Sequence, residues 1–389
     1  MIKHSFKIIW NQKKKNVYII SELFILFMVL LISSIYLIEK YELYTGGVGA
    51  NIEDAFYLNL REKDGQRVDC KDKLKNMLID LESLPDVKKV SYSYFSIPYI
   101  WSMSSSYVKY DTLKTSRAVI READEHFAEV LGLNILAGHW LENDYEGANP
   151  QIVIDIQVAE KLFGSIDNAI NKVVEIVGKK QVVGVYEKLK RNEYEENYPS
   201  CFFLLDQTNM MGVDVVLKCK DGKMVPPSQI SKIIFSYFNK DSYAIRYAST
   251  MEAKKREVNS GKRVEIVMVS FVAVFLVINI ILGMIGIFGY SVKRRKAELG
   301  LRRAVGSSAH KIHYLLLLES WTLTIFALIP AIILTVQIPL LDLYPVETNL
   351  FIKSLCLSII LIFILVSISV YYPAYIASKV QASEALQEE

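Results

Sequence analysis

The sequence predicts a polytopic α-helical membrane protein with four transmembrane helices and a large mixed α+β extracytoplasmic domain between helices 1 and 2. Three observations predict this fold class. Four long apolar stretches are almost free of charged residues. The two short segments richest in lysine and arginine precede the first stretch and separate the second from the third. A long segment of mixed charge, residues 39–263, separates the first and second stretches.

Each apolar stretch is long enough to cross a bilayer as a helix. A hydrocarbon core of about 30 Å requires about 20 helical residues at about 1.5 Å per residue. The first stretch is too long for a signal peptide, and no small-residue cleavage site follows before Glu39, so we expect a retained anchor. The predicted transmembrane helices cover residues 17–38, 264–290, 313–338 and 351–371.

The short loops predict the orientation, because loops rich in lysine and arginine remain in the cytoplasm. Residues 1–16 form a basic, amphipathic start, whereas residues 339–350 contain acids and no base. We therefore expect a multi-pass protein of the cytoplasmic (inner) membrane with both termini in the cytoplasm. Residues 291–312 and the tail, 372–389, are then cytoplasmic, and residues 39–263 and 339–350 are extracytoplasmic.

The extracytoplasmic segment shows both helical and strand patterns. Residues 69–84 and 226–238 have helical spacing, and residues 151–164 read as a strand that runs into a short helix ending at Gly164. Residues 179–189 and 242–248 are predicted strands. The glycine-rich stretch 45–51 is expected to be a flexible link. A Cys201–Cys219 disulfide and three free outer thiols both remain open.

Known catalytic and nucleotide-binding motifs are missing from the sequence. It contains no G-x-x-x-x-G-K-[ST], no H-E-x-x-H and no G-x-S-x-G motif. The five histidines are scattered, without metal-ligand spacing. We therefore predict no catalytic residue, no metal site, no cofactor in this chain and no nucleic-acid partner.

The loop at residues 291–312 combines a basic cluster with a patterned helix. Basic residues at the membrane interface attract anionic lipid by about 1 kcal/mol each. We assign this role to Lys13, Lys14, Lys15, Lys293, Arg295 and Lys296. The following stretch, AELGLRRAVGSS, has apolar and basic sides, and Gly306 with Ser307 and Ser308 predicts a stop and a new helix cap. Glu22 and Glu319, inside apolar stretches, are expected to pair with nearby basic residues.

The stretch RRKAELGLRRAVGSS resembles the R-x-x-E-[IL]-G-[IL]-R-[RK]-A-[LV]-G-[AS] signature of the FtsX-like permease domain in MacB-type ABC transporters. The tail YYPAYIASKVQASEAL is similar to the end of that domain. Residues 127–141, 159–164 and 181–190 look like the two-lobed periplasmic domain of the same family. The resemblance implies a set of ATPase-coupling residues: Arg294, Glu298, Leu299, Gly300, Leu301, Arg302, Arg303, Ala304 and Gly306.

The resemblance also implies partners and a mode of action. It implies a second permease chain, in a homo- or heterodimer, and a cytoplasmic ABC ATPase dimer that binds ATP and Mg. ATP hydrolysis by that partner would move the extracytoplasmic domain, for export or extraction of a peptide, lipoprotein or small molecule. A periplasmic adaptor with an outer-membrane channel remains an open possibility. An ATPase-linked envelope sensor, or a regulator of cell-wall hydrolases, is the alternative function.

Overall fold

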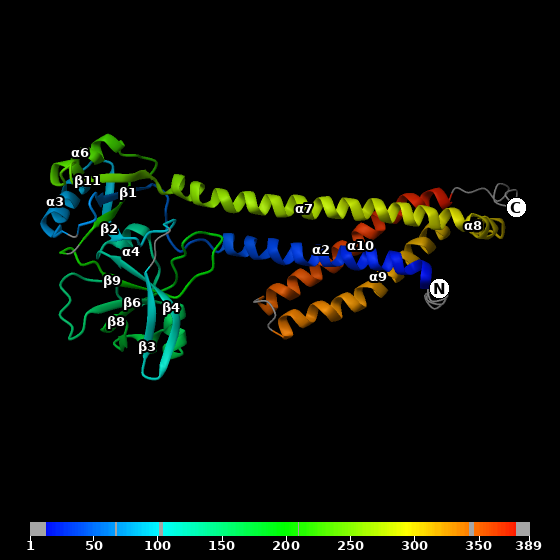
Figure 1. Ribbon diagram of the computed structural model, residues 1–389, viewed down its shortest axis with the longest axis horizontal. Helices are drawn as coiled ribbons and strands as arrows, with labels where there is room; N and C mark the ends of the chain where they lie inside the picture. Colours follow the sequence, from blue (N-terminus) through cyan, green and yellow to red (C-terminus); the bar gives the residue numbers. More distant parts are fainter. Residues whose placement is uncertain (1–12, 67, 101–103, 209, 342–345, 379–389) are drawn as a thin grey trace. The chain divides into compact units, whose positions relative to one another are not determined.

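The computed structural model describes residues 13–66, 68–100, 104–208, 210–341 and 346–378 (Figure 1). The predicted amphipathic start therefore lies almost wholly outside the described residues, as do the side chains of Lys13, Lys14 and Lys15 and most of the tail that is predicted to be cytoplasmic. Two compact units make up the chain. One contains Met1–Glu42 and Arg263–Glu389, and the other contains Leu43–Lys262.

The first unit contains four helices that are long and apolar enough to span a membrane, within the described residues. They belong to α2 (Lys13–Thr45), α7 (Met251–Arg294), α9 (Ala309–Leu340) and α10 (Thr348–Ser378). The predicted fold class is confirmed, since the mixed α/β domain lies between the first and second of these helices. The helices extend past the apolar stretches, most of all α7, which begins in the extracytoplasmic unit.

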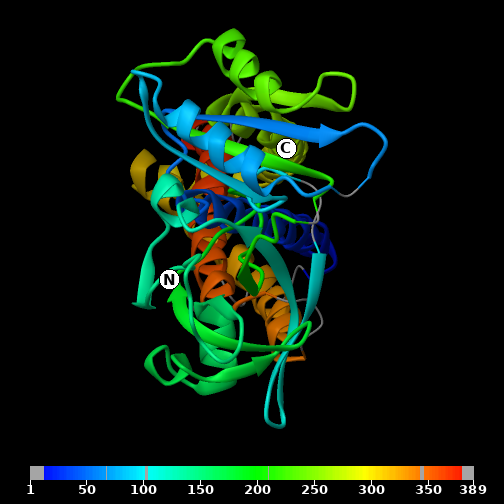
Figure 2. The same ribbon diagram turned by 90° about the vertical axis from the view of Figure 1, so that its left-hand side faces the viewer.

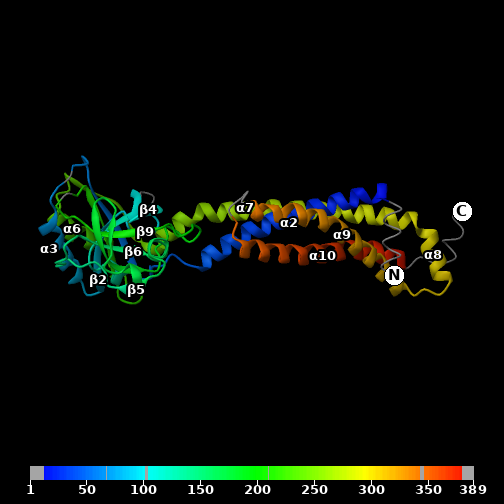
Figure 3. The same cartoon turned by 90° about the horizontal axis from the view of Figure 1, so that it is seen from below.

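Side chains from all four long helices form one apolar cluster, with Leu23, Met284, Ala327 and Ile362 fully buried in it. Helices α9 and α10 lie side by side (Figure 3), and the Trp321 indole Nε1 donates a hydrogen bond to Ser367 Oγ at 3.0 Å. Helix α7 differs from the other three, because none of its most apolar window is buried within this chain. Its apolar surface is therefore available to lipid or to another chain.

The extracytoplasmic unit is built on one eleven-stranded sheet (Figure 2). Its first part is antiparallel, in the order β11-β1-β10-β2. These strands are Tyr243–Thr250, Ala55–Glu62, Gly212–Cys219 and Val87–Tyr94. Helices α3 (Lys71–Glu82) and α6 (Pro227–Tyr237) bury their apolar sides with one face of these strands, through residues such as Leu74 and Ile234.

The second part of the sheet closes on itself. The pairing runs β4-β3-β7-β8-β6-β9 and returns from β9 to β4, while β5 adds to β8. In chain order the strands are β3 (Ser104–Tyr110), β4 (Leu113–Ala123), β5 (Ile135–Gly138), β6 (Gln151–Asp155), β7 (Val173–Glu175), β8 (Lys179–Tyr186) and β9 (Ser200–Leu204). Two short helices, α4 (Phe127–Leu131) and α5 (Ile156–Phe163), and a 3-10 turn (Asp167–Ala169) complete it.

Local signals in this domain predict several elements correctly. The stretch at 151–164 forms β6 followed by α5, as expected. The Asp155 carboxylate caps α5 by accepting from the Val158 amide at 2.9 Å, and Gly164 ends it at φ +73°. The helices expected at 69–84 and 226–238 are α3 and α6.

The glycine-rich link at 45–51 is packed, contrary to the expectation of a flexible segment. Val48 is 5% exposed, and its carbonyl accepts from the Lys190 amide at 2.8 Å. Gly49 has φ +84°, and a Cβ there would lie 2.3 Å from the Lys188 carbonyl oxygen. The glycines therefore permit a close backbone approach. Cys201 and Cys219 are buried free thiols, so the structure contains no disulfide between them.

Candidate functional site

The chain reverses between α7 and α9 through a short helix. Helix α7 ends at Arg294, and α8 (Lys296–Ala304) follows after one residue with non-helical angles, Arg295. Gly306 adopts φ +96°, which ends the turn. Ser308 then caps α9, since its Oγ accepts from the Lys311 amide at 3.3 Å. The predicted stop and new cap are therefore present.

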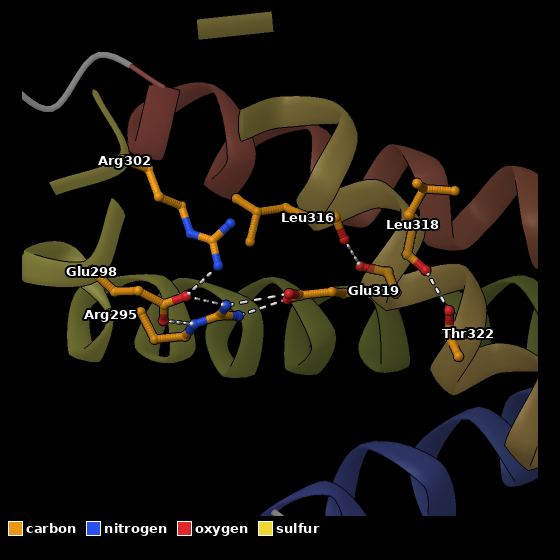
Figure 4. Close-up of polar contacts among 8 residues, drawn as sticks. Arg295, Glu298, Arg302, Leu316, Leu318, Glu319 and Thr322 are labelled. Carbon is orange, nitrogen blue, oxygen red and sulfur yellow. Dashed lines mark hydrogen bonds and ion pairs between the residues drawn. The ribbon is translucent and has the colours of Figure 1, made fainter. Parts of the chain in front are cut away.

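Arg295 holds this reversal together through two carboxylates (Figure 4). Its Nε lies 2.9 Å from Glu298 Oε2 on α8, and its Nη1 lies 2.6 Å from Glu319 Oε2 on α9. Its Nη2 also donates to both carboxylates, at 3.2 Å each. Arg302 Nη2 adds a contact of 3.0 Å to Glu298 Oε1. One guanidinium therefore fixes α8 relative to the third turn of α9.

Burial differs among the members of this ion-pair network. The side chains of Arg295 and Glu319 are 14% and 12% exposed, whereas those of Glu298 and Arg302 are 42% and 36% exposed. Hydrogen bonds from Arg295, followed by its charge and by Arg302, outweigh burial and lower the pKa of Glu298. Burial alone would lower the pKa of Arg295, but hydrogen bonds to Glu298 and Glu319 raise it. Both groups thus remain charged at neutral pH.

Helix α8 presents two different faces. Leu299 and Gly300 are buried, and Leu299 belongs to the apolar cluster of the long helices. The opposite face is exposed and apolar, although it lies in a strongly basic loop. Leu301 is 56% exposed and Val305 is 82% exposed, and both lie on the same side as two exposed alanines, Ala297 and Ala304. A fixed helix with an uncovered apolar side is typical of a protein-binding surface.

The structure places two neighbouring arginines in different surroundings. Arg294, expected in the coupling set, is exposed at the end of α7, with its guanidinium 5.8 Å from the centre of the Tyr290 ring. Arg295, expected at the lipid headgroups, is half-buried in the ion-pair network. Arg295 also stands three residues before Glu298, which is the spacing of the R-x-x-E signature. By this spacing, Arg295 aligns with the first arginine of the signature, one position after Arg294.

Other predicted residues fall into separate groups. Lys293 is exposed and Lys296 is half-buried, next to the network. Arg303 points back to the turn, where its Nη1 donates to the Ser307 carbonyl at 3.5 Å. Because Leu299 and Gly300 face the chain's own interior, they position α8, whereas Leu301 and Ala304 lie on its exposed face.

The two intramembrane acids behave differently. Glu319 pairs with Arg295, as the sequence analysis expects. Glu22 lies against Gly283, where an added Cβ would be 2.2 Å from Glu22 Oε1, and its Oε2 has no hydrogen-bond partner among the described residues. Ala297 is absent from the coupling set that the resemblance implies, but it shares the exposed side of α8 with Leu301 and Ala304.

Comparisons with known proteins give the family. Residues 45–227 match the MacB-like periplasmic core domain, and residues 269–382 match the FtsX-like permease C-terminal domain. A search among curated proteins gave no match.

Two solved structures are similar to part of the chain. The periplasmic region of MacB from Actinobacillus actinomycetemcomitans is 13% identical, over 54% of this chain and 94% of that one, with a TM-score of 0.37. The extracellular domain of the ABC-type transporter YknZ from Gram-positive bacteria is 17% identical, over 49% of this chain and 100% of that one, with a TM-score of 0.33. The two domain models together, in this order, show that the chain belongs to the FtsX-like ABC transporter permeases that carry a MacB-like periplasmic core domain.

Proposed function

We propose that this chain converts ATP hydrolysis by a separate ABC ATPase dimer into movement of its extracytoplasmic domain. The observation that carries this proposal is the exposed apolar face of α8, held in place by Arg295. The ATPase would dock on Leu301 and Val305, and Arg295 would pass its displacement to α7 and α9. ATP and Mg would be bound by the partner, because the sequence has no P-loop.

Substitutions on the exposed face test the docking. Leu301→Asp and Val305→Asp place a charge where an apolar contact is expected, so the ATPase that co-purifies with the wild-type chain should be lost or reduced. Ile79→Asp is the matched control, because Ile79 is 57% exposed on α3 of the extracytoplasmic unit. ATP turnover by the purified chain alone, or wild-type co-purification with both α8 variants, would contradict the proposal.

The proposed orientation places the N-terminus, the 291–312 loop and the C-terminus in the cytoplasm. Lys13, Lys14, Lys15, Lys293 and Lys296 would then contact anionic headgroups. Impermeant labelling of single cysteines at Lys15 and Arg302 should require permeabilised cells, whereas Lys114 and Lys223 should react from outside. The exposed native thiol, Cys356, is first replaced by serine. Reaction of position 302 from outside would refute the orientation.

A second permease chain is the partner proposed for α7. The most apolar window of this helix has no buried residues within the chain, and its exposed side includes Phe271 and Phe275. Lipid and a second copy, or a related chain, would share this surface. The cargo proposed for the assembly is a peptide, lipoprotein or small molecule, exported or extracted from the extracytoplasmic side.

A further inference from the structure

A second polar cluster lies in the extracytoplasmic unit, around Glu193. The side chain of Glu193 is 3% exposed. Its Oε1 accepts a hydrogen bond from the Tyr99 hydroxyl at 2.8 Å and lies 2.8 Å from Lys255 Nζ. Its Oε2 accepts from Asn259 Nδ2 at 2.6 Å. Lys255 and Asn259 belong to the first turns of α7, so this one carboxylate holds the start of that helix.

The same segment also holds the end of α2. Lys190 Nζ donates to the Leu43 carbonyl at 2.8 Å and to the Glu193 carbonyl at 3.0 Å. Leu43 lies in the last turn of α2, where carbonyls have no partner within the helix and a cation is favourable. The rings of Tyr44 and Tyr194 lie 5.3 Å apart, which adds an apolar contact beside the ion.

The domain fixes this segment from its other side. The Arg191 carbonyl accepts from the Tyr99 amide at 2.7 Å. The Arg121 guanidinium, which is buried, donates to the Leu189 carbonyl at 2.9 Å and to the Ser96 carbonyl at 2.8 Å. Leu189 itself is 1% exposed in the domain core. The segment is therefore part of the folded domain and not a loose surface loop.

We propose that Leu189–Glu195, here called the joint, carries movement of α2 and α7 into the extracytoplasmic domain, with Glu193 as its central positioning residue. The inference goes beyond the docking proposed for α8 and depends on it only for the source of the movement. Besides the joint, α2 is connected to the domain through the 46–54 link, and α7 through its continuation from β11 and through Met251, which is buried in the domain core. The joint adds directional, charge-assisted hydrogen bonds to both helix ends.

The charge state of Glu193 suits its proposed role in the joint. Burial alone would raise the pKa of Glu193, but hydrogen bonds from Asn259, Lys255 and Tyr99 outweigh it, and the pKa is lowered. The carboxylate therefore stays ionised at neutral pH and keeps its contact with Lys255. The ion pair between Glu193 and Lys255 is therefore maintained at neutral pH, so that the contact between the joint and α7 persists.

Two distance measurements on the full chain, assembled with its co-purifying ATPase in nanodiscs, test the joint. Spin labels at Ser260 and Asp167 report how firmly α7 is held to the domain, and a single label at Asp167 reports the distance between two copies. In the wild-type chain we expect a narrow Ser260–Asp167 distribution that ATP does not change, and an Asp167–Asp167 distance that shifts with ATP. In Glu193→Ala we expect the first distribution to broaden and the second shift to be lost, with ATP turnover retained.

The outcomes separate this inference from the proposed function. A narrow Ser260–Asp167 distribution together with an unchanged Asp167 shift in Glu193→Ala would overturn the joint. A wild-type chain without any Asp167 shift would overturn the proposed movement, while the Ser260–Asp167 distribution still decides whether the joint holds α7. Glu196→Ala, at an exposed position in the same loop, should behave as wild type. If Glu193→Ala does not fold, Lys255→Ala decides by the same measurements, because that side chain is 30% exposed.

Discussion

Glu193 and Glu298 have similar structural roles in very different surroundings. Each carboxylate binds more than one donor and fixes the position of a helix end. Glu193 is 3% exposed and has one cationic and two neutral donors, whereas Glu298 is 42% exposed and is bound by two arginines. Buried hydrogen bonds contribute more when lost than solvent-exposed ion pairs do. The first site should therefore matter for folding and the second mainly for coupling.

Removal of the buried carboxylate should have the largest effect on stability. Glu193→Ala leaves Lys255, Asn259 and Tyr99 without their shared acceptor. Breaking a buried pair in this way typically destabilises a protein by about 3 kcal/mol. We expect the free energy of unfolding of the extracytoplasmic unit to fall by about this amount, measured by chemical denaturation. Glu196→Ala should change it by less than about 0.5 kcal/mol, and an equal loss in both variants would contradict the comparison.

The arginine of the other network should have the next largest effect. Arg295→Lys keeps the charge but loses the fork that contacts Glu298 and Glu319 together. Hydrogen bonds to charged groups contribute about 1.5–3 kcal/mol, and we expect the contacts between α8 and α9 to be weakened by about this amount. The main consequence should be reduced ATP turnover in the assembled complex. Arg294→Lys is the matched control, since Arg294 is exposed and outside the network. Equal turnover in the two variants would show that Arg295 is not a positioning residue.

The sequence predicts the loop at residues 291–312 far better than the joint, because the contacts of the loop are close together along the chain and those of the joint are not. Helix α8, its glycine stop and the Ser308 cap depend on neighbouring residues, so spacing alone identifies them. Glu193 reaches Asn259 and Tyr99, and Lys190 reaches Leu43, only after the sheet has formed. Nothing in the local pattern of the 189–195 stretch indicates these partners.

The same argument explains the remaining differences. The burial of Arg295, beside an exposed Arg294, depends on a break at the end of α7 that periodicity does not reveal. The glycine-rich link has the composition of a flexible segment, but Val48 and Ile52 have apolar partners in the domain core. The four membrane helices and the β6–α5 unit were predictable, because length and capping residues determine them.

Asp124 extends the comparison of Glu193 and Glu298. Its carboxylate is buried like that of Glu193, but its hydrogen-bond donors are neutral, without a cation. It accepts from Ser91 Oγ at 2.6 Å and from the Tyr92 amide at 3.2 Å, yet burial dominates and raises its pKa to about 7. A raised pKa in the folded state means that this group's contribution to stability is full below its unfolded pKa and is lost as pH rises to about 7.

The substitution Asp124→Asn should therefore stabilise the protein, relative to the wild type, more at pH 8 than at pH 5. We expect the melting temperature at pH 8 to rise by about 2–4 °C, which corresponds to about 1 kcal/mol in a domain of this size. The measurement is thermal unfolding of the wild-type and variant chains at both pH values. Glu193→Gln should show no such pH-dependent gain, since the pKa of Glu193 is lowered. A pH-independent effect of Asp124→Asn would mean that its carboxylate is ionised in the folded protein throughout this range.

The smallest effect should come from the exposed carboxylate. Glu298→Gln keeps the size of the side chain and removes its charge, while Arg295 retains its contact with Glu319. Ion pairs this exposed contribute about 0.5 kcal/mol, so thermal unfolding should hardly change. The remaining partner is Arg302, which is freed to interact with solvent or with the docked ATPase. We expect a modest fall in ATP turnover at low salt that disappears near 1 M salt, where the screening length is about 3 Å. A loss as large as that of Arg295→Lys, and insensitive to salt, would instead place Glu298 in a buried contact with the partner, and the contrast with Glu193 would then hold only for the isolated chain.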